Sequence, residues 1–271
     1  MNPIPSMTRR EMLRLGGAAF VLHALDSHAE PALTGGFDFI VVNDTHYIDE
    51  ACGEWLGRVV GAMRESAPDA VFCLHAGDVT DRGTAVASGA AAQIFAGLGC
   101  PFYPVPGNHD FLTSDDRSGY DTAFPGRLNY RFEHSGWQFL ALDSTQGTDF
   151  SETTISDATL TWLERETLKL DPARPVFAFT HFPLGDGVEF RPLNTGALLA
   201  LLAKVNLRWV HSGHWHGESL KPEGHGTLTT SRCCARLRGN RDGSPLKGWH
   251  VYRAAPDGIL TRRFVTAPPT P

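Results

Sequence analysis

Short apolar runs that end in polar clusters recur along this chain. The run from Phe37 to Asn43 (FDFIVVN) is rich in β-branched and aromatic residues and leads into Asp44 and His46. Runs of this length and composition are typical of buried β-strands. Because functional sites in open α/β sheets lie at the carboxyl ends of strands, the clusters predict a single site at one rim. The other four clusters are Gly77-Asp78, Gly107-Asn108-His109-Asp110, Thr180-His181 and Gly213-His214-Trp215-His216.

Stretches of helical composition alternate with these runs, and the alternation predicts an α/β fold. Ser135-Gly136 between two apolar runs indicates a hairpin. The chain shows no internal repeat and no linker long enough to divide it, so one domain over residues 30–271 is expected. Helices are expected at about 50–66, 84–97, 157–170 and 195–204, and strands at about 37–43, 70–75, 101–105, 130–134, 137–142, 176–180, 207–211 and, mostly antiparallel, 227–230, 250–253 and 259–265.

Residues 1–29 have the composition of an export signal. Arg9 and Arg10 precede the short apolar run 15–22, and the small residues around Ala29 suit cleavage by signal peptidase. The run is too short to span a bilayer, so no stable membrane anchor is expected. The paired arginines resemble a twin-arginine signal, which implies the twin-arginine export machinery as a partner and a periplasmic or secreted protein. The alternative is an ordinary amphipathic first helix.

The net charge of −6 bears on the class of partner. Proteins that grip long nucleic acid need a basic surface, so this balance argues against such a partner. A small phosphoester substrate is compatible with the charge, because bound metal cations can dominate the local field. The five cysteines are an odd number without a CxxC zinc pattern, and their pairing cannot be read from spacing.

The polar clusters offer ligands for metal ions. Histidine and carboxylate side chains suit ions such as zinc, manganese or iron, and an asparagine oxygen is a further neutral ligand. Seven ligands are too many for one tetrahedral ion and enough for two ions that share a carboxylate. Glycines 77, 107 and 213 allow the backbone to turn sharply beneath the ligands. The candidate ligands are Asp44, His46, Asp78, Asn108, His181, His214 and His216.

The order of these clusters resembles the pattern of the calcineurin-like metallophosphoesterase family. That pattern reads Asp-x-His, Gly-Asp, Gly-Asn-His-Asp, His and Gly-His-x-His, and every element is present between Asp44 and His216. The Gly-His-x-His ending is most similar to the class III cyclic-nucleotide phosphodiesterase branch. The resemblance implies a four-layer αββα sandwich that carries a dinuclear metal site at its strand ends.

The resemblance also implies a role for each residue. Two ions of iron, manganese or zinc are expected, and two cations about 3.5–4 Å apart lower the pKa of a shared water, which yields a hydroxide that attacks phosphorus. His109 is not a ligand in the family; it faces the substrate, and Asp110 orients it. By the same resemblance Asp44, His46 and His216 hold one ion, Asn108, His181 and His214 hold the other, and Asp78 bridges them.

Several alternatives remain open at this stage. Purple acid phosphatases place a tyrosine three residues after the Gly-Asp aspartate, and Asp81 at that position speaks against an iron–tyrosinate site. A phosphodiesterase is expected; a phosphomonoesterase or a non-catalytic metal-binding protein on the same fold is the alternative. Trp215 could stack on a base or simply pack. Arginines that could bind phosphate are Arg82, Arg232 and Arg236, together with Arg117 and Arg191 in the loops 112–124 and 184–193.

Overall fold

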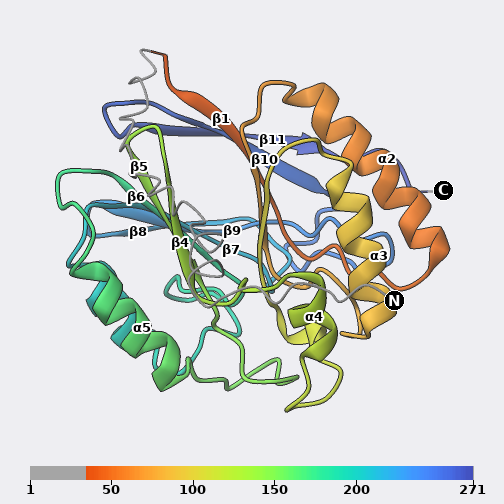
Figure 1. Ribbon diagram of the computed structural model, residues 1–271, viewed down its shortest axis with the longest axis horizontal. Coiled ribbons are helices and arrows are strands. Elements are labelled where there is room, and N and C mark those ends of the chain that lie inside the picture. The colour runs from red at the N-terminus through yellow and green to blue at the C-terminus, as the bar shows by residue number, and fades with distance from the viewer. Residues whose placement is uncertain (1–34, 271) are drawn as a thin grey trace, which may run out of the picture. The chain divides into compact units, whose positions relative to one another are not determined.

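Two β-sheets with helices on both outer faces make up the fold (Figure 1). The computed structural model describes residues 35–270, so the expected export signal at residues 1–29 lies outside the described part. The strands are β1 (Phe37–Val42), β2 (Cys73–Ala76), β3 (Phe102–Val105), β4 (Tyr130–His134), β5 (Trp137–Leu142), β6 (Val176–Thr180), β7 (Leu207–Ser212), β8 (Ser219–Glu223), β9 (Gly226–Thr230), β10 (Gly248–Ala254) and β11 (Leu260–Thr266).

The sheets have five and six strands, in the orders β11-β10-β1-β2-β3 and β4-β5-β6-β7-β9-β8.

Among residues 35–270 no helix combines the length and the apolar character that a membrane span requires. The helices are α2 (Glu50–Ser66), α3 (Ala85–Ala96), α4 (Ser118–Ala123), α5 (Asp157–Thr167) and α6 (Thr195–Leu202), and a short 3-10 turn covers Asn108–Asp110.

The central strands are apolar on both faces, which explains their unbroken apolar composition. In β1, Ile40 and Val42 pack under α2 and α3, whereas Phe37, Phe39 and Val41 lie in the core between the two sheets. Alternation with period two sends successive side chains to opposite faces. Strands β5 and β6 divide their residues in the same way between the inter-sheet core and the core beneath α5 and α6. The four-layer αββα sandwich is therefore confirmed.

Side-chain caps set where three of the helices begin. Asp49 accepts a hydrogen bond from Cys52 N at the start of α2, and Ser156 does the same for Thr159 N at α5. Thr84 caps α3 in this way. An N-cap oxygen satisfies one of the N–H groups that the first helical turn leaves free, so these polar residues fix the helix boundaries.

Three elements differ from the expectation. Helix α4 lies in a segment expected to be a loop, because its sequence SGYDTA is too short to show helical periodicity. Strand β8 (SLKPE) forms the edge of the six-stranded sheet, where its proline is tolerated. The run 227–230 was expected among the antiparallel strands; β9 pairs antiparallel with β8 and parallel with β7.

The topology brings the predicted polar clusters to one rim. Strands β1, β2 and β3 run parallel in the first sheet, and β5, β6, β7 and β9 run parallel in the second. The carboxyl ends of parallel strands meet at the same edge of a sheet. Backbone hydrogen bonds from Asp44 N to Gly77 O and from Gly213 N to His181 O join neighbouring clusters at this edge.

Candidate metal centre and active site

The first ligand set consists of Asp44, His46, Asp78 and His216, whose donor atoms lie close enough to hold one metal ion. His216 Nε2 is 3.0 Å from Asp44 Oδ1 and 3.3 Å from His46 Nε2. His46 Nε2 is also 3.5 Å from Asp78 Oδ2. All four side chains are at least mostly buried, so this set offers two carboxylates and two imidazoles in a low-dielectric pocket.

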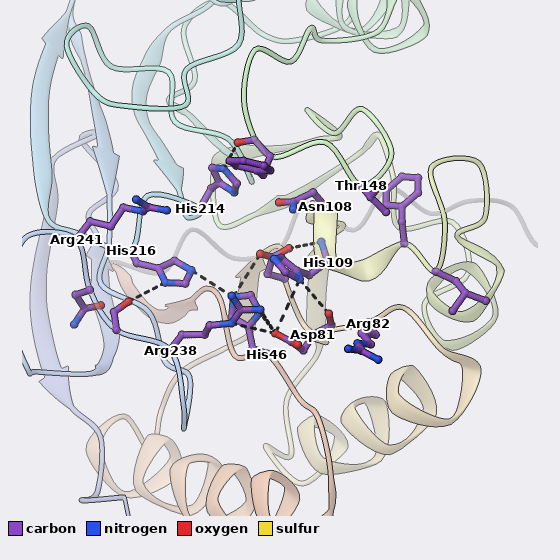
Figure 2. Close-up of a pocket in the computed structure, with 16 residues that line it drawn as sticks. His46, Asp81, Arg82, Asn108, His109, Thr148, His214, His216, Arg238 and Arg241 are labelled. Carbon is purple, nitrogen blue, oxygen red and sulfur yellow. Dashed lines mark hydrogen bonds and ion pairs between the residues drawn. The ribbon is translucent and has the colours of Figure 1, made fainter.

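The second ligand set consists of Asp78, Asn108, His181 and His214. His181 Nε2 is 3.1 Å from His214 Nδ1, 3.2 Å from Asn108 Oδ1 and 3.4 Å from Asp78 Oδ1. The two oxygens of Asp78 thus face different ligand sets, which is the placement a bridging carboxylate needs. Figure 2 shows His46, His214 and His216 around the same hollow, with Asn108 beside them.

The orientation of the four histidine rings supports metal binding. Each ring turns one nitrogen toward the other ligands. The second nitrogen lies beside an oxygen that accepts a hydrogen bond, which is a carboxylate oxygen for His46 and a backbone carbonyl oxygen for the other three rings. Such a partner fixes the tautomer and leaves the first nitrogen free to ligate. The partners are Asp81 Oδ1 for His46 (3.1 Å), Ala76 O for His181 (2.9 Å), Phe150 O for His214 (2.8 Å) and Gly239 O for His216 (3.1 Å).

The backbone beneath the ligands is strained. Positive φ angles are uncommon for residues other than glycine and cluster at functional sites. Gly107 approaches so closely that a Cβ would lie 2.1 Å from Asp78 Oδ1, and one on Gly77 would lie 2.5 Å from the His181 ring. Close contacts of this kind hold the ligands where they are. Five candidate ligands adopt positive φ: Asp44 (53°), His46 (46°), Asp78 (55°), His214 (62°) and His216 (47°).

The two ligand sets differ in protonation. Burial lowers the pKa of His216, but the Asp44 carboxylate outweighs this effect and raises the pKa to about 11. Burial and, to a smaller extent, the neighbouring His181 lower the pKa of His214 to about 3. An imidazole must be neutral to ligate, so an ion entering the first set displaces the His216 proton, whereas His214 is ready to ligate.

His109 lies at the edge of the ligand sets without belonging to either. Its ring contacts the His46 ring edge-on at 4.8 Å between centroids, and its side chain is 31% exposed to the cavity. Nδ1 lies 3.0 Å from Asp81 O, and since a carbonyl only accepts, Nδ1 carries the proton. The residue lines the cavity, and its Nε2 makes no hydrogen bond within the described residues.

Asp110 does not orient the His109 ring, which corrects the expectation from the sequence. In the described part of the chain no hydrogen bond or ion pair joins the two side chains. The fully buried Asp110 carboxylate instead accepts from Val79 N, Thr80 N and Gly107 N and from the Thr80 hydroxyl. Burial and the Asp78 charge raise its pKa to about 6. Asp110 joins the two loops that present Asp78 and Asn108.

A segment late in the chain supports the first ligand set from outside. Arg238 forms an ion pair with Asp81, whose carboxylate holds His46 Nδ1, and Gly239 provides the carbonyl that holds His216. The hydrogen bond to His46 lowers the pKa of Asp81 well below its usual range, so Asp81 is ionised. The sequence singled out neither Arg238 nor Gly239, because neither follows an apolar run.

The ligands open into a cavity of about 950 Å³ whose lining includes Arg82, Arg238 and Arg241. Among residues 35–270 neither Arg82 nor Arg241 has a carboxylate within ion-pair distance, whereas Arg238 is paired. Trp215 does not line the cavity; its ring packs over Gly217. Of the other arginines considered from the sequence, Arg236 lies outside the lining, and Arg117, Arg191 and Arg232 are held by Asp143, Asp186 and Asp242.

Comparison with known proteins agrees with this geometry. A probable cyclic nucleotide phosphodiesterase from Fibrobacter succinogenes is 31% identical over 57% of this chain and 60% of its own length. The 3',5'-cyclic adenosine monophosphate phosphodiesterase CpdA of Escherichia coli strain K12 is 26% identical over 81% of this chain and 86% of its own. The structure of the Plasmodium inner membrane complex anchor GAP50 shares the fold, with a TM-score of 0.58, 15% identity and coverage of 88% and 86%.

The family model of the calcineurin-like phosphoesterases matches residues 37–218. This range holds both ligand sets and His109, and members of the family use a dinuclear metal centre. The donors present here fit that group, because each imidazole turns one nitrogen toward the other ligands and Asp78 faces both sets. The chain therefore belongs to the calcineurin-like phosphoesterase family and is a metal-dependent hydrolase of phosphoesters.

Proposed function

We propose that this protein is a phosphodiesterase that hydrolyses 3',5'-cyclic nucleotides. The observation that carries the proposal is the position of His109 beside both ligand sets, with Nε2 free on the cavity side. When the P–O bond of an alkyl phosphodiester breaks, the leaving oxygen departs as an alkoxide, which needs a proton, and a positioned histidine can supply it. Two similar proteins are named as cyclic nucleotide phosphodiesterases, which supports the same substrate class.

The chain's own residues divide the remaining work. When bound, two metal ions supply an activated water and positive charge for the phosphoryl oxygens. Asp78 and the six other ligands would hold those ions, and the carbonyls of Phe150 and Gly239 keep His214 and His216 turned toward them. The backbone oxygen of Asp81 accepts from His109 Nδ1, so that Nε2 is the nitrogen that donates to the leaving oxygen. Arg82 adds positive charge at the cavity wall.

The identity of the ions is part of the proposal. Both ligand sets combine nitrogen and oxygen donors and contain no thiolate, a mixture that suits iron, manganese or zinc. We expect metal-free protein to regain activity with manganese or iron. Reconstitution with each ion, followed by elemental analysis and assay of the same sample, tests this. Reactivation by magnesium alone would contradict the assignment, because magnesium prefers oxygen ligands.

A comparison of ester classes tests the phosphodiesterase. The metal-loaded protein is assayed with bis-p-nitrophenyl phosphate, p-nitrophenyl phosphate and 3',5'-cyclic AMP. We expect higher kcat/KM for the diester than for the monoester, and adenosine monophosphate that accumulates as the product of cyclic AMP. A preference for the monoester of tenfold or more, about 1.4 kcal/mol in transition-state stabilisation, would overturn the proposal.

A phosphomonoesterase is the second candidate, and the unpaired arginines favour it. A monoester dianion carries more negative charge than a diester and gains more from cations beside the metals. Arg82 and Arg241 both line the cavity without an acidic partner in the described residues. If this candidate is right, Arg82→Met will reduce kcat/KM for p-nitrophenyl phosphate far more than for the diester.

We propose in addition that residues 1–29 direct export through the twin-arginine machinery. The motivation is the sequence Arg9-Arg10 before a short apolar run, together with a multi-ligand metal site that is safest to load before transport. Replacing Arg9 and Arg10 with lysine is expected to trap the precursor in the cytoplasm, measured by fractionation and immunoblotting. Unchanged delivery to the periplasm would remove the idea.

A further inference from the structure

The cavity is much larger than a phosphate group. At about 950 Å³ it lies at the upper end of the range of ordinary small-molecule sites, so it has room for substrate atoms well beyond the phosphorus. Figure 2 shows Arg241 beside His214 and His216 at one side of the hollow and Arg82 at the other. The two sides therefore offer the rest of the substrate different surroundings.

Flat side chains gather on the His214 side. The Phe150 ring lines the cavity, with the residue 59% exposed, and its centroid lies 6.3 Å from that of Phe190. Phe190 meets the His214 ring edge-on at 5.3 Å, and the Arg241 guanidinium lies over the Phe190 ring at 4.5 Å. We call Phe150, Phe190 and Arg241 the aromatic wall.

Backbone contacts tie the aromatic wall to the metal ligands. Phe150 O lies 2.8 Å from His214 Nε2 and accepts a hydrogen bond from it, and Arg241 N donates to His216 O at 2.9 Å. Phe190 has a φ of 65°, a left-handed conformation that is strained for an aromatic residue. Strain of this kind persists only where the surroundings hold the residue, and the two backbone contacts fix Phe150 and Arg241 beside His214 and His216.

Among the described residues, no ion pair neutralises the charge of Arg241. Arg238 on the same segment pairs with Asp81, and Arg232 pairs with Asp242. Arg241 has no carboxylate partner in the described part of the chain and is an exposed residue. Its planar guanidinium rests on the Phe190 face, an arrangement that favours a second flat group on the opposite face.

We propose that the aromatic wall is the nucleobase subsite of this enzyme. The purine or pyrimidine of a nucleoside phosphodiester stacks on the Phe150 ring and the Arg241 guanidinium while the phosphate lies at the two ligand sets. Stacking suits this wall because every base presents a flat π face, and no polar side chain of the wall other than Arg241 is needed. This subsite rests on the proposed diesterase function.

Two diesters separate the subsite from the function itself. The metal-loaded enzyme is assayed with 3',5'-cyclic AMP, which has a base, and with sn-glycero-3-phosphoethanolamine, which has none. We expect Phe150→Leu and Arg241→Met each to raise KM for cyclic AMP by about tenfold, in line with the loss of one stacking partner. KM for the glycerol diester and the metal content by elemental analysis should stay unchanged, as should every value for the control Arg58→Met on the exposed face of α2.

Arg241→Lys distinguishes stacking from a plain positive charge. Lysine keeps the charge but lacks the planar group, so KM for cyclic AMP should stay as high as in Arg241→Met. Full rescue by lysine would overturn the subsite, as would equal losses on both diesters. If the wild-type enzyme hydrolyses neither diester, the proposed function fails and the subsite fails with it. Calorimetric binding of adenosine monophosphate should weaken in Arg241→Met, and unchanged binding would also overturn the subsite.

Discussion

The two ligand sets share Asp78 but differ in charge and in what holds them. The first set contains the additional carboxylate Asp44, and the ionised Asp81 lies directly behind His46. The second set has only neutral donors apart from Asp78, and backbone carbonyls hold its histidines. Ligand charge raises the affinity of a site for a cation, so the first ion should bind more tightly than the second.

The groups that hold the histidines of the two ligand sets come from different parts of the chain, and this is a second difference between the sets. Ala76 O, which holds His181, comes from β2 in the interior of a sheet. Arg238 and Gly239, which support the first set, come from a segment that follows the range matched by the family model. The side chain of Asn240 shapes this segment through bonds to Cys233 N, Ser244 O and Leu246 O. The first set should therefore respond to changes in the late segment, and the second should not.

Replacing the shared carboxylate should have the largest effect. Asp78→Asn removes the charge that both sets use and leaves two cations to repel each other. We expect loss of both ions by elemental analysis and a fall in kcat/KM larger than the 10–100-fold that partners outside the coordination shell usually cost. Retention of one tightly bound ion with most of the activity would contradict the shared role of Asp78.

His109 gives the next largest effect and should leave both sets intact. His109→Ala removes a ring that belongs to neither set, so two ions should remain bound. Loss of the proton donor should slow diesters with alkoxide leaving groups by about 10²–10⁴-fold. The effect should be smaller with bis-p-nitrophenyl phosphate, because p-nitrophenolate leaves without a proton. Equal losses on both kinds of diester would indicate positioning instead of proton donation.

Asp81 should separate the two sets. Asp81→Ala removes the carboxylate that orients His46 and leaves the Arg238 charge unpaired beside the first ion. We expect the first ion to bind about 10–100-fold more weakly and the second to be unaffected, measured by chelator competition. The control Asp186→Ala breaks only an exposed pair with Arg191 and should change neither affinity. Equal weakening of both ions would mean that the sets are not independent.

The sequence predicted what depends on local pattern. The strand ends carry Asp44, Asp78 and His181 because buried strands have recognisable composition, and parallel strands bring their ends together. The structure brings all seven predicted ligands into the two sets.

Residue roles that depend on contacts between distant segments could not be predicted from local sequence pattern. Arg241 reaches the cavity through a hydrogen bond to the backbone of His216, 25 positions before it, and no local pattern marks it. The role expected of Asp110 was wrong for a related reason. Its carboxylate is satisfied by backbone N–H groups of a neighbouring loop, and that arrangement arises only when the two loops meet.

The smallest expected effect is the release of a proton when the first ion binds. The His216 pKa of about 11 before an ion binds lies above the ordinary value of 6.5. The His216 ring is therefore protonated on both nitrogens in the folded chain from pH 7 to 10. Binding of the first ion must displace that proton, and its apparent affinity should rise about tenfold per pH unit in this window. The pKa of His214 is about 3, so its ring is already neutral in the same window and releases no proton when an ion binds. Titration calorimetry at pH 8 in two buffers of different ionisation enthalpy measures the protons released. We expect about one proton with the tight ion and none with the weaker one; equal release from both would show that the two sets do not differ in charge as the structure describes.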